Sequence, residues 1–398
     1  AVRGYFGGHD SNGWDYANSP LQTGSTFKIM ALAAALQQGI SLDTNYSSAP
    51  YQLPGSDLVT NVGGGCGVCD LREATKQSLN TSYLRLQSDL KNGTQDTADM
   101  AHALGVARSL PGIEETLTEN GKQPFEGVVL GQYQSRPLDM ATVMSTLANQ
   151  GVWHNPHFVQ RVENAAGEVL YEHPDDEGER RVSANVANNV LEAMGPVAAW
   201  SNGSLAGGRA SASKTGTTQL GDSGTNKDAW MVGATPQLAS AVWVGTADNT
   251  SAIFDQYGGI MYGAGAPTKI WKSVLDNSLA DQEFQQFPSA YPVRFGTVSA
   301  GGGAPAYNSG GSAGGQSTQN YTGPAQNGAP EEETSPAPAE SPEAGRDAPS
   351  QQPETQGGNN GNGGNRGNGG GNNEPAPPEA PSLDDILDRE GGLADLLG

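Results

Sequence analysis

A sharp change in composition near residue 296 divides this chain of 398 residues into a part that can bury a core and a part that cannot. Before it, Trp, Leu, Met and Val recur; beyond it, Gly, Pro, Asn, Gln, Ser and Glu dominate. With few large apolar side chains, the second part cannot offset the conformational entropy that folding costs. We expect a domain over 1–296, a disordered acidic linker over 297–381 and a short amphipathic segment over 382–398.

The chain is strongly acidic, with a formal net charge of −22. Residues 301–398 contribute half of that imbalance, because they hold 14 acidic and 3 basic residues. Such a charge disfavours nucleic acid as a partner, since its phosphates would be repelled. No apolar run approaches the length of a bilayer span, so we expect any export signal or membrane anchor to lie upstream.

Cys66 and Cys69 are the only cysteines, and they follow a run of three glycines. Two thiols without histidine partners make a poor zinc site. A thioredoxin-like redox motif needs a βαβ setting, which the glycines do not supply. The simplest remaining interpretation is a local disulfide, provided that the compartment is oxidising.

The spacing of apolar residues predicts where helices and strands lie. From Ser25 to Leu36 apolar side chains surround the helix nearly completely, so this helix should be buried. Ser183 should cap a helix over 184–194. We also expect a strand over 2–8, a loop over 44–69, helices from Asp70 to Leu90 and over 100–104, 138–147 and 268–275, a hairpin within 157–171, and strands over 210–218, 229–235 and 238–245. This order predicts an α/β fold in which an antiparallel sheet is sandwiched by helices and carries an all-helical subdomain.

Three short motifs stand out as carriers of chemistry. They are Ser25-Thr26-Phe27-Lys28, Ser78-Leu79-Asn80 and Lys214-Thr215-Gly216-Thr217-Thr218. Together, in this order, they are typical of serine enzymes that react with penicillin. The first two patterns also occur elsewhere, at Ser88–Lys91, Ser211–Lys214 and Ser183–Asn185, so their settings must decide between the copies.

Ser25 and Lys28 have the setting that nucleophilic catalysis requires. Residues three apart on a helix share one face, so Lys28 can reach the Ser25 hydroxyl. A lysine held out of water loses its preference for the charged form and can take the proton of the serine. Ser88–Lys91 instead precedes a helix end that faces solvent, and Ser211–Lys214 lies in a strand, where positions three apart face opposite ways.

The third motif is predicted to be a strand beside the start of the Ser25 helix. Lys214 could bind a substrate carboxylate, and Thr215 and Thr217 would offer hydroxyls on one face of the strand. Gly216 would let a substrate backbone approach closely, and Thr218 is a further candidate for substrate binding. The backbone amides of Ser25 and Thr217 could form an oxyanion hole. The alternative is a polar strand without a catalytic role.

Residues 1 to about 296 resemble the transpeptidase domain of class A, bifunctional penicillin-binding proteins of actinobacterial type. The likeness extends beyond the three motifs to Gly7-Gly8, Val129-Leu130-Gly131-Gln132, Pro137-Leu138-Asp139-Met140-Ala141 and Asp228-Ala229-Trp230-Met231-Val232-Gly233. The resemblance implies a peptidoglycan D,D-transpeptidase in which Ser25 attacks the D-Ala–D-Ala bond of a stem peptide. β-Lactams would acylate the same serine, and neither a metal nor an organic cofactor is expected.

The resemblance also implies a role for each remaining motif residue. Lys28 would be the base for acylation, and Ser78 would relay a proton to the leaving amine. Asn80 would hold the substrate amide. Lys214 would hold the terminal carboxylate together with Thr215 and Thr217. An amine from a neighbouring stem peptide would then take the acyl group.

Class A proteins carry a transmembrane helix and a glycosyltransferase domain ahead of the transpeptidase, and this sequence contains neither. We therefore expect a truncated sequence whose protein works at the extracytoplasmic face of the plasma membrane, anchored by an upstream segment. The leucine-rich end is either a docking peptide for a cell-wall or division protein or a frayed terminus. Its apolar residues are Leu383, Ile386, Leu387, Leu393, Leu396 and Leu397.

Other functions on the same fold remain open. In a D,D-carboxypeptidase or a β-lactamase, water would replace the acceptor amine. A β-lactamase also needs an added base for deacylation, and no segment resembles its glutamate-containing loop. A non-catalytic penicillin sensor would keep the fold but lose one of Lys28, Asn80 or Lys214, all of which are present.

Overall fold

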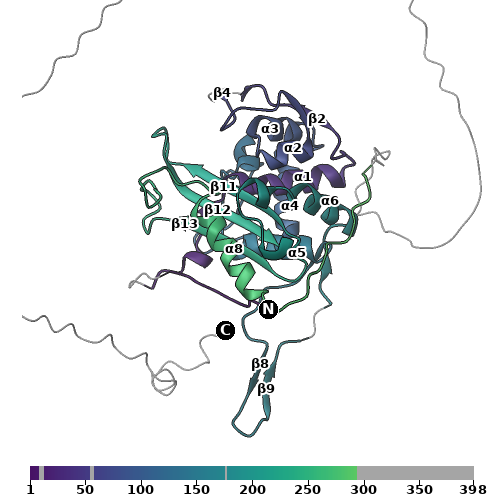
Figure 1. The fold of residues 1–398 in the computed structure, drawn as a ribbon, viewed down its shortest axis with the longest axis vertical. Helices are drawn as coiled ribbons and strands as arrows, with labels where there is room; N and C mark the ends of the chain where they lie inside the picture. Colours follow the sequence, from purple (N-terminus) through teal and green to yellow (C-terminus); the bar gives the residue numbers. More distant parts are fainter. Residues whose placement is uncertain (9–12, 54–57, 175–176, 294–398) are drawn as a thin grey trace, which may run out of the picture. The chain divides into compact units, whose positions relative to one another are not determined.

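The computed structural model describes residues 1–8, 13–53, 58–174 and 177–293. Its largest sheet is antiparallel, in the order β11–β12–β13, and is formed by Ala212–Gln219, Asn226–Ala234 and Ala239–Gly245 (Figure 1). The strands lie close to the predicted ranges, and a short connection joins the last two, as expected. The predicted tail segments, 297–381 and 382–398, lie outside the described residues.

The central strand β12 shows why helices cover both faces of this sheet. Successive side chains of a strand point to opposite faces, and both sets on β12 are apolar. Trp230 and Val232 face the main core, whereas Met231 packs with Trp271 and Leu275 of α8. Helices α5 and α6 contact the sheet from the first side, and α7 and α8 from the second. The predicted helix–sheet sandwich is therefore confirmed.

Helix α1, Lys28–Gln37, is the buried helix that the sequence predicted. It follows a 3₁₀ turn, η2, at Gly24–Phe27, and every residue from Thr26 to Leu36 is buried. It contacts α3, α4 and α6. The other helices are α2 (Leu71–Lys76), α3 (Asn80–Ser88), α4 (Thr94–Leu104), α5 (Pro137–Ala148), α6 (Ala184–Met194), α7 (Val197–Trp200) and α8 (Ala266–Ser278).

Helix α6 begins as predicted, with the Ser183 hydroxyl accepting a hydrogen bond from the Val186 amide at 3.2 Å. Asp70 caps α2 in the same way, through the Glu73 amide. The predicted hairpin within 157–171 is formed by β8 (Arg161–Glu163) and β9 (Val169–Glu172) and extends away from the helices in Figure 1. Local capping and turn signals therefore located these elements well.

The expectations for residues 2–8 and 44–69 were wrong. Residues 2–8 have no regular secondary structure; the Val2 amide donates to the carbonyl of His157, and no strand within the described ranges pairs with this segment. The expected loop over 44–69 contains β2 (Asn45–Ser47), β3 (Tyr51–Gln52), β4 (Leu58–Val59) and the start of β5 (Val68–Asp70). β2 pairs with β5 and β3 with β4, so these strands depend on contacts that a local pattern does not reveal.

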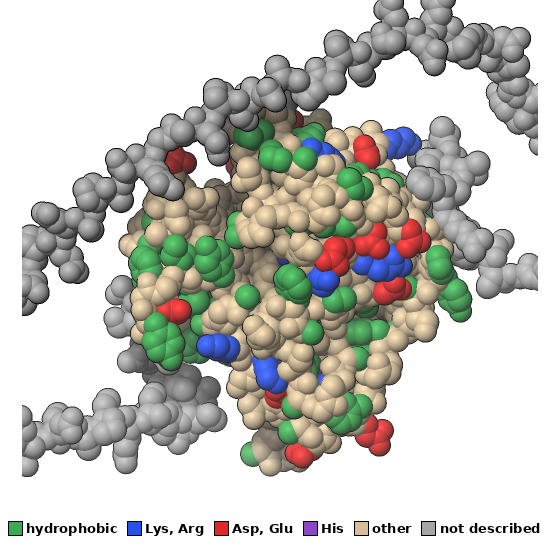
Figure 2. Space-filling model, turned by 45° about the horizontal axis from the view of Figure 1, so that its top comes forward, with side chains coloured by type: hydrophobic (Ala, Val, Ile, Leu, Met, Phe, Trp, Pro, Cys, Tyr) green, Lys and Arg blue, Asp and Glu red, His purple; other side chains and the backbone are tan. Residues whose placement is uncertain are grey.

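The remaining elements are short. They are η1 (Tyr16–Asn18), β1 (Leu21–Gln22), η3 (Glu126–Leu130), β6 (Gln134–Ser135), β7 (Val152–Trp153), β10 (Glu179–Arg180) and η4 (Ala206–Gly208). On the face that Figure 2 shows, basic side chains are interspersed with acidic ones rather than gathered in one field. Across the described ranges, no helix is both long and apolar enough to span a bilayer.

Candidate active site

The three motifs predicted from the sequence meet at the start of α1. The side-chain nitrogen Nζ of Lys28 lies 2.8 Å from Oγ of Ser25 and 2.7 Å from Oδ1 of Asn80. Nζ of Lys214 on β11 lies 2.7 Å from Oγ of Ser78, and that same hydroxyl is 3.3 Å from Nζ of Lys28. Residues that are far apart in the sequence therefore form one continuous hydrogen-bond network.

Burial differs sharply between the hydroxyls and the lysines of this network. Lys28 and Lys214 are fully buried, whereas Ser25 and Ser78 are half-buried. Ser25 is the only residue from Thr23 to Leu36 that is not fully enclosed. A ligand can therefore reach the serine hydroxyl, while the two lysines are kept from full hydration.

This burial changes the protonation of both lysines. Desolvation lowers the pKa of Lys28 well below the ordinary lysine value, and the nearby charge of Lys214 lowers it further. Desolvation also lowers the pKa of Lys214, to about 7. The hydrogen-bond partners of both amines are hydroxyl and carbonyl oxygens, including the backbone carbonyls of Ser78 and Thr215. Lys28 is thus suited to accept the proton of Ser25 across their 2.8 Å contact.

Ser78 occupies a break between α2 and α3, although the sequence predicted helical structure from Asp70 to Leu90. Its φ is +58°, in the left-handed region that residues other than glycine seldom adopt. This backbone conformation points the Ser78 carbonyl at Lys28 and its hydroxyl at Lys214. The site is therefore built on a strained residue, and the strain is offset by contacts with the two lysines.

This strain predicts an unusual order of stability for two variants. We expect Ser78→Gly to be more stable than Ser78→Ala by about 1 kcal/mol, because glycine adopts a positive φ without a steric penalty. Urea unfolding of both variants measures the difference. Ser88, an exposed residue at the end of α3, provides the control: Ala should be the more stable choice there. If Ser78→Ala were as stable as Ser78→Gly, the backbone at position 78 would not be strained.

Gly24 and Gly216 allow the start of α1 and strand β11 to touch through their backbones. A Cβ on Gly24, whose φ is +57°, would overlap the carbonyl of Thr217, and one on Gly216 would overlap the carbonyl of Thr23. We expected Gly216 to make room for a substrate; in the structure the space is filled by the protein itself. Gly131, part of the Val-Leu-Gly-Gln stretch, lies equally close to the backbone of Gly24.

The threonines of β11 divide between two faces of the strand. Thr215 and Thr217 are half-buried and share one face. The Thr217 hydroxyl accepts a hydrogen bond from the Gly263 amide at 3.2 Å and keeps its own proton available. Thr218 lies on the other face, where its hydroxyl donates to the carbonyl of Gln22 at 3.2 Å. The Thr218 hydroxyl proton is therefore already used, whereas that of Thr217 is available to a ligand.

The predicted oxyanion-hole residues, Ser25 and Thr217, belong to the two segments that Gly24 brings into backbone contact. Their amides therefore lie in neighbouring stretches of chain. Within the part of the chain that the structure describes, no group of three or more His, Cys, Asp or Glu side chains is placed to hold a metal ion.

Sequence reasoning missed a contact from the region expected to be a loop. The carbonyl of Thr60 accepts a hydrogen bond from Nδ2 of Asn80 at 3.2 Å. No residue type marks such a backbone group in a sequence. Cys66 and Cys69, in the same region, are joined by a disulfide with a Cα–Cα distance of 6.0 Å. The disulfide closes the turn that contains Gly67.

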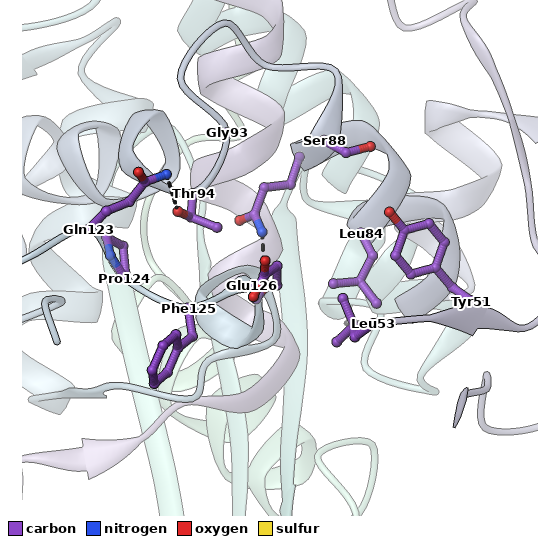
Figure 3. Close-up of a pocket in the computed structure, with 11 residues that line it drawn as sticks. Tyr51, Leu53, Leu84, Ser88, Gly93, Thr94, Gln123, Pro124, Phe125 and Glu126 are labelled. Atoms are coloured by element: carbon purple, nitrogen blue, oxygen red, sulfur yellow. Dashed lines mark hydrogen bonds between the residues drawn. The ribbon is translucent and has the colours of Figure 1, made fainter. Parts of the chain in front are cut away.

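A separate cavity of about 460 Å³ lies among the helices (Figure 3). Leu84 and Ser88 of α3, Thr94 of α4, and the side chains of Gln123 and Phe125 are among the residues that line it. No residue of the three motifs lines this cavity, so it is distinct from the candidate active site.

Comparisons with known proteins agree with the geometry. Residues 8–274 match the family described as the penicillin binding protein transpeptidase domain. Penicillin-binding protein 1A of Mycolicibacterium smegmatis is 50% identical over 309 residues, which are 77% of this chain and 39% of that protein. The Mycobacterium tuberculosis protein of the same name is 50% identical over 298 residues, 74% of this chain and 36% of its own. The chain thus spans less than two fifths of these relatives.

Solved structures show the same likeness in three dimensions. The structure of the penicillin-binding protein PonA1 from Mycobacterium tuberculosis is 50% identical, with a TM-score of 0.71 over 74% of this chain and 77% of that one. PonA1 in complex with penicillin V also has a TM-score of 0.71, at 49% identity, over 74% of this chain and 78% of that one.

Proposed function

The chain belongs to the penicillin-binding protein transpeptidase family, and from this premise we propose that it is a serine D,D-transpeptidase that cross-links peptidoglycan stem peptides. One observation carries the proposal: Lys28, whose pKa is lowered by burial, lies 2.8 Å from the reachable Ser25 hydroxyl. That pair is joined through Ser78 to Lys214. β-Lactams would react covalently at the same serine, as the PonA1 complex with penicillin V suggests for a relative.

In the proposed acylation, neutral Lys28 takes the proton of Ser25 as Oγ attacks the carbonyl carbon of the penultimate D-Ala. The carbonyl oxygen becomes an oxyanion, which the amides of Ser25 and Thr217 stabilise. The C–N bond to the terminal D-Ala then breaks. Its nitrogen receives a proton through the Ser78 hydroxyl, which lies between both lysines, and an ester at Ser25 remains.

Substrate recognition is proposed to rest on the opposite wall of the site. A terminal carboxylate beside Lys214 would raise the pKa of that lysine again, because an opposite charge favours the ammonium form. Thr215 and Thr217 supply hydroxyls on the same strand. Asn80 has one amide hydrogen directed to Thr60 and a second that is available to a carbonyl of the ligand.

In the proposed second step, an amine of a neighbouring stem peptide attacks the ester and restores the Ser25 hydroxyl. The same site could transfer the acyl group to water, as in a D,D-carboxypeptidase or a β-lactamase. A penicillin sensor without catalysis would not need the complete network. One set of contacts joins Lys28, Ser78, Asn80 and Lys214. This complete network favours an enzyme over a non-catalytic sensor.

The proposed reaction can be tested with a short peptide that ends in D-Ala-D-Ala and a labelled D-amino acid as acceptor. We expect the acceptor to replace the terminal D-Ala, and we expect the penicilloyl-enzyme to persist for minutes. Protein blocked beforehand with penicillin should form no product. Hydrolysis that does not respond to acceptor concentration would indicate a carboxypeptidase, and rapid turnover of penicillin would indicate a β-lactamase.

We further propose that the domain works at the extracytoplasmic face of the plasma membrane, held there by a segment outside this chain. Its proposed substrate is a cell-wall peptide. The Cys66–Cys69 disulfide supports the same compartment, because disulfides persist where conditions are oxidising. Docking of the leucine-rich end to a cell-wall or division protein stays a prediction, since that segment lies outside the described residues.

A further inference from the structure

Asn61 caps helix α3 from a different part of the chain. Its Oδ1 accepts a hydrogen bond from the Thr81 amide, in the first turn of α3, at 3.1 Å. Its Nδ2 donates to the Thr81 hydroxyl at 2.9 Å. The residue at the usual capping position, Leu79, has no polar side chain and makes no capping bond. Asn61 therefore supplies the acceptor that the start of α3 lacks locally.

The residue before Asn61 determines which way the Asn80 amide points. The Thr60 carbonyl accepts from Nδ2 of Asn80 at 3.2 Å, while Oδ1 of Asn80 lies 2.7 Å from Nζ of Lys28. In the reversed orientation, the amide oxygen of Asn80 would face the carbonyl oxygen of Thr60, and two acceptors repel. Thr60 thus favours the orientation in which Asn80 accepts from Lys28 and keeps one N–H for a ligand.

Asn61 is itself anchored to the turn that the disulfide closes. Its Nδ2 donates to the Ser48 carbonyl at 2.8 Å, and the Ser48 amide donates to the Gly67 carbonyl, also at 2.8 Å. Gly67 lies between Cys66 and Cys69, which the disulfide joins. A chain of contacts therefore runs from this rigid turn through Asn61 to the start of α3, where the second motif ends.

We propose that Asn61 is a positioning residue for acylation: by capping α3 and anchoring the Thr60 carbonyl, it holds the Asn80 amide between Lys28 and the ligand. This inference rests on the proposed function and adds a residue that positions the proposed site. Without Asn61, the Thr60 carbonyl loses its anchor and the Asn80 amide is free to rotate. Lys28 then loses an acceptor that favours its charged form, and the ligand loses a fixed donor.

The test measures the second-order rate of acylation by a fluorescent penicillin as a function of pH. Asn61→Ala should react roughly tenfold more slowly than wild type, the effect expected when one anchoring hydrogen-bond set is lost. Its rate should begin to rise at lower pH, because loss of the Asn80 acceptor lowers the pKa of Lys28. The other titratable groups that face Lys28 are Lys214 on β11 and Tyr83 on α3, and both are unchanged.

Ser183→Ala is the matched control, since it removes a helix cap of the same kind from α6. It should lower stability without changing the rate or its pH profile. Asn61→Asp keeps an acceptor for the Thr81 amide but cannot donate to Ser48, so it covers the case in which the alanine variant does not fold. It should fold and react more slowly than wild type.

If folded Asn61 variants react at wild-type rates with a wild-type pH profile, the role of Asn61 is overturned and the proposed function is unaffected. An equal slowing in Ser183→Ala would also overturn it, because stability would then explain the effect. Failure of the wild-type protein to react with penicillin would instead count against the proposed function.

Discussion

Replacing Ser25 with alanine should reduce covalent labelling by a fluorescent penicillin to background. The acyl group needs an oxygen nucleophile beside Lys28, and Ser25 Oγ is the hydroxyl that lies 2.8 Å from that amine and can be reached by a ligand. Gel fluorescence after denaturation measures the covalent adduct. The variant should remain folded, because the substitution removes one half-buried oxygen and adds no volume.

Ser88→Ala is a sharp control for this prediction. Ser88 also stands three residues before a lysine, but it is exposed at the end of α3, and its hydroxyl donates to the backbone of Arg85. Labelling of Ser88→Ala should equal that of wild type. Undiminished labelling of Ser25→Ala would overturn the assignment of the nucleophile and, with it, the proposed mechanism.

Replacing Lys28 with methionine should slow acylation by about 10²–10⁴-fold, the usual contribution of a positioned general base. Methionine fills similar space without a proton acceptor. In wild type, the rate should rise with pH through the lowered pKa of Lys28, because only its neutral amine can take the Ser25 proton. The variant should lose this rise. Stopped-flow or quenched acylation across pH measures both effects, and a wild-type rate in Lys28→Met would contradict the role.

Burial of Lys28 and Lys214 also predicts that stability increases with pH, and Lys28→Met tests this prediction. Between the folded and the unfolded pKa of a buried lysine, the unfolded chain binds more protons. The wild-type free energy of unfolding should therefore increase as pH rises toward the ordinary lysine value, from about 7 for Lys214. Lys28→Met should flatten part of this dependence. Lys91→Met, at an exposed position, should leave it unchanged.

Sequence reasoning succeeded where the signal is local. The cap at Ser183, the apolar run of α1 and the i, i+3 spacing of Ser25 and Lys28 each depend on neighbours within one turn, and the structure contains all three. The strands of the main sheet were also found: β12 and β13 are long and rich in apolar residues, and β11 carries the Lys-Thr-Gly motif.

The rest depended on contacts between distant residues. Helical patterning continues on both sides of Ser78, so the local sequence does not predict the break between α2 and α3. The lysines that stabilise the Ser78 φ of +58° come from two other elements. β2 pairs with β5 across 20 intervening residues of glycine-rich chain. Asn61 belongs to no motif. The strand expected over 2–8 was wrong: among the described residues, no strand pairs with this segment.

The backbone contact between Gly24 and Thr217, repeated between Gly216 and Thr23, fixes the spacing between β11 and the start of α1 in a way that side chains cannot adjust. A larger residue at either glycine would push β11 away from Ser25, and the proposed mechanism would then lose both transpeptidation and acylation by β-lactams. Variants that survive antibiotic selection should therefore keep both glycines. Their substitutions should lie around the site, where they can obstruct an inhibitor and still preserve the spacing of the reacting groups.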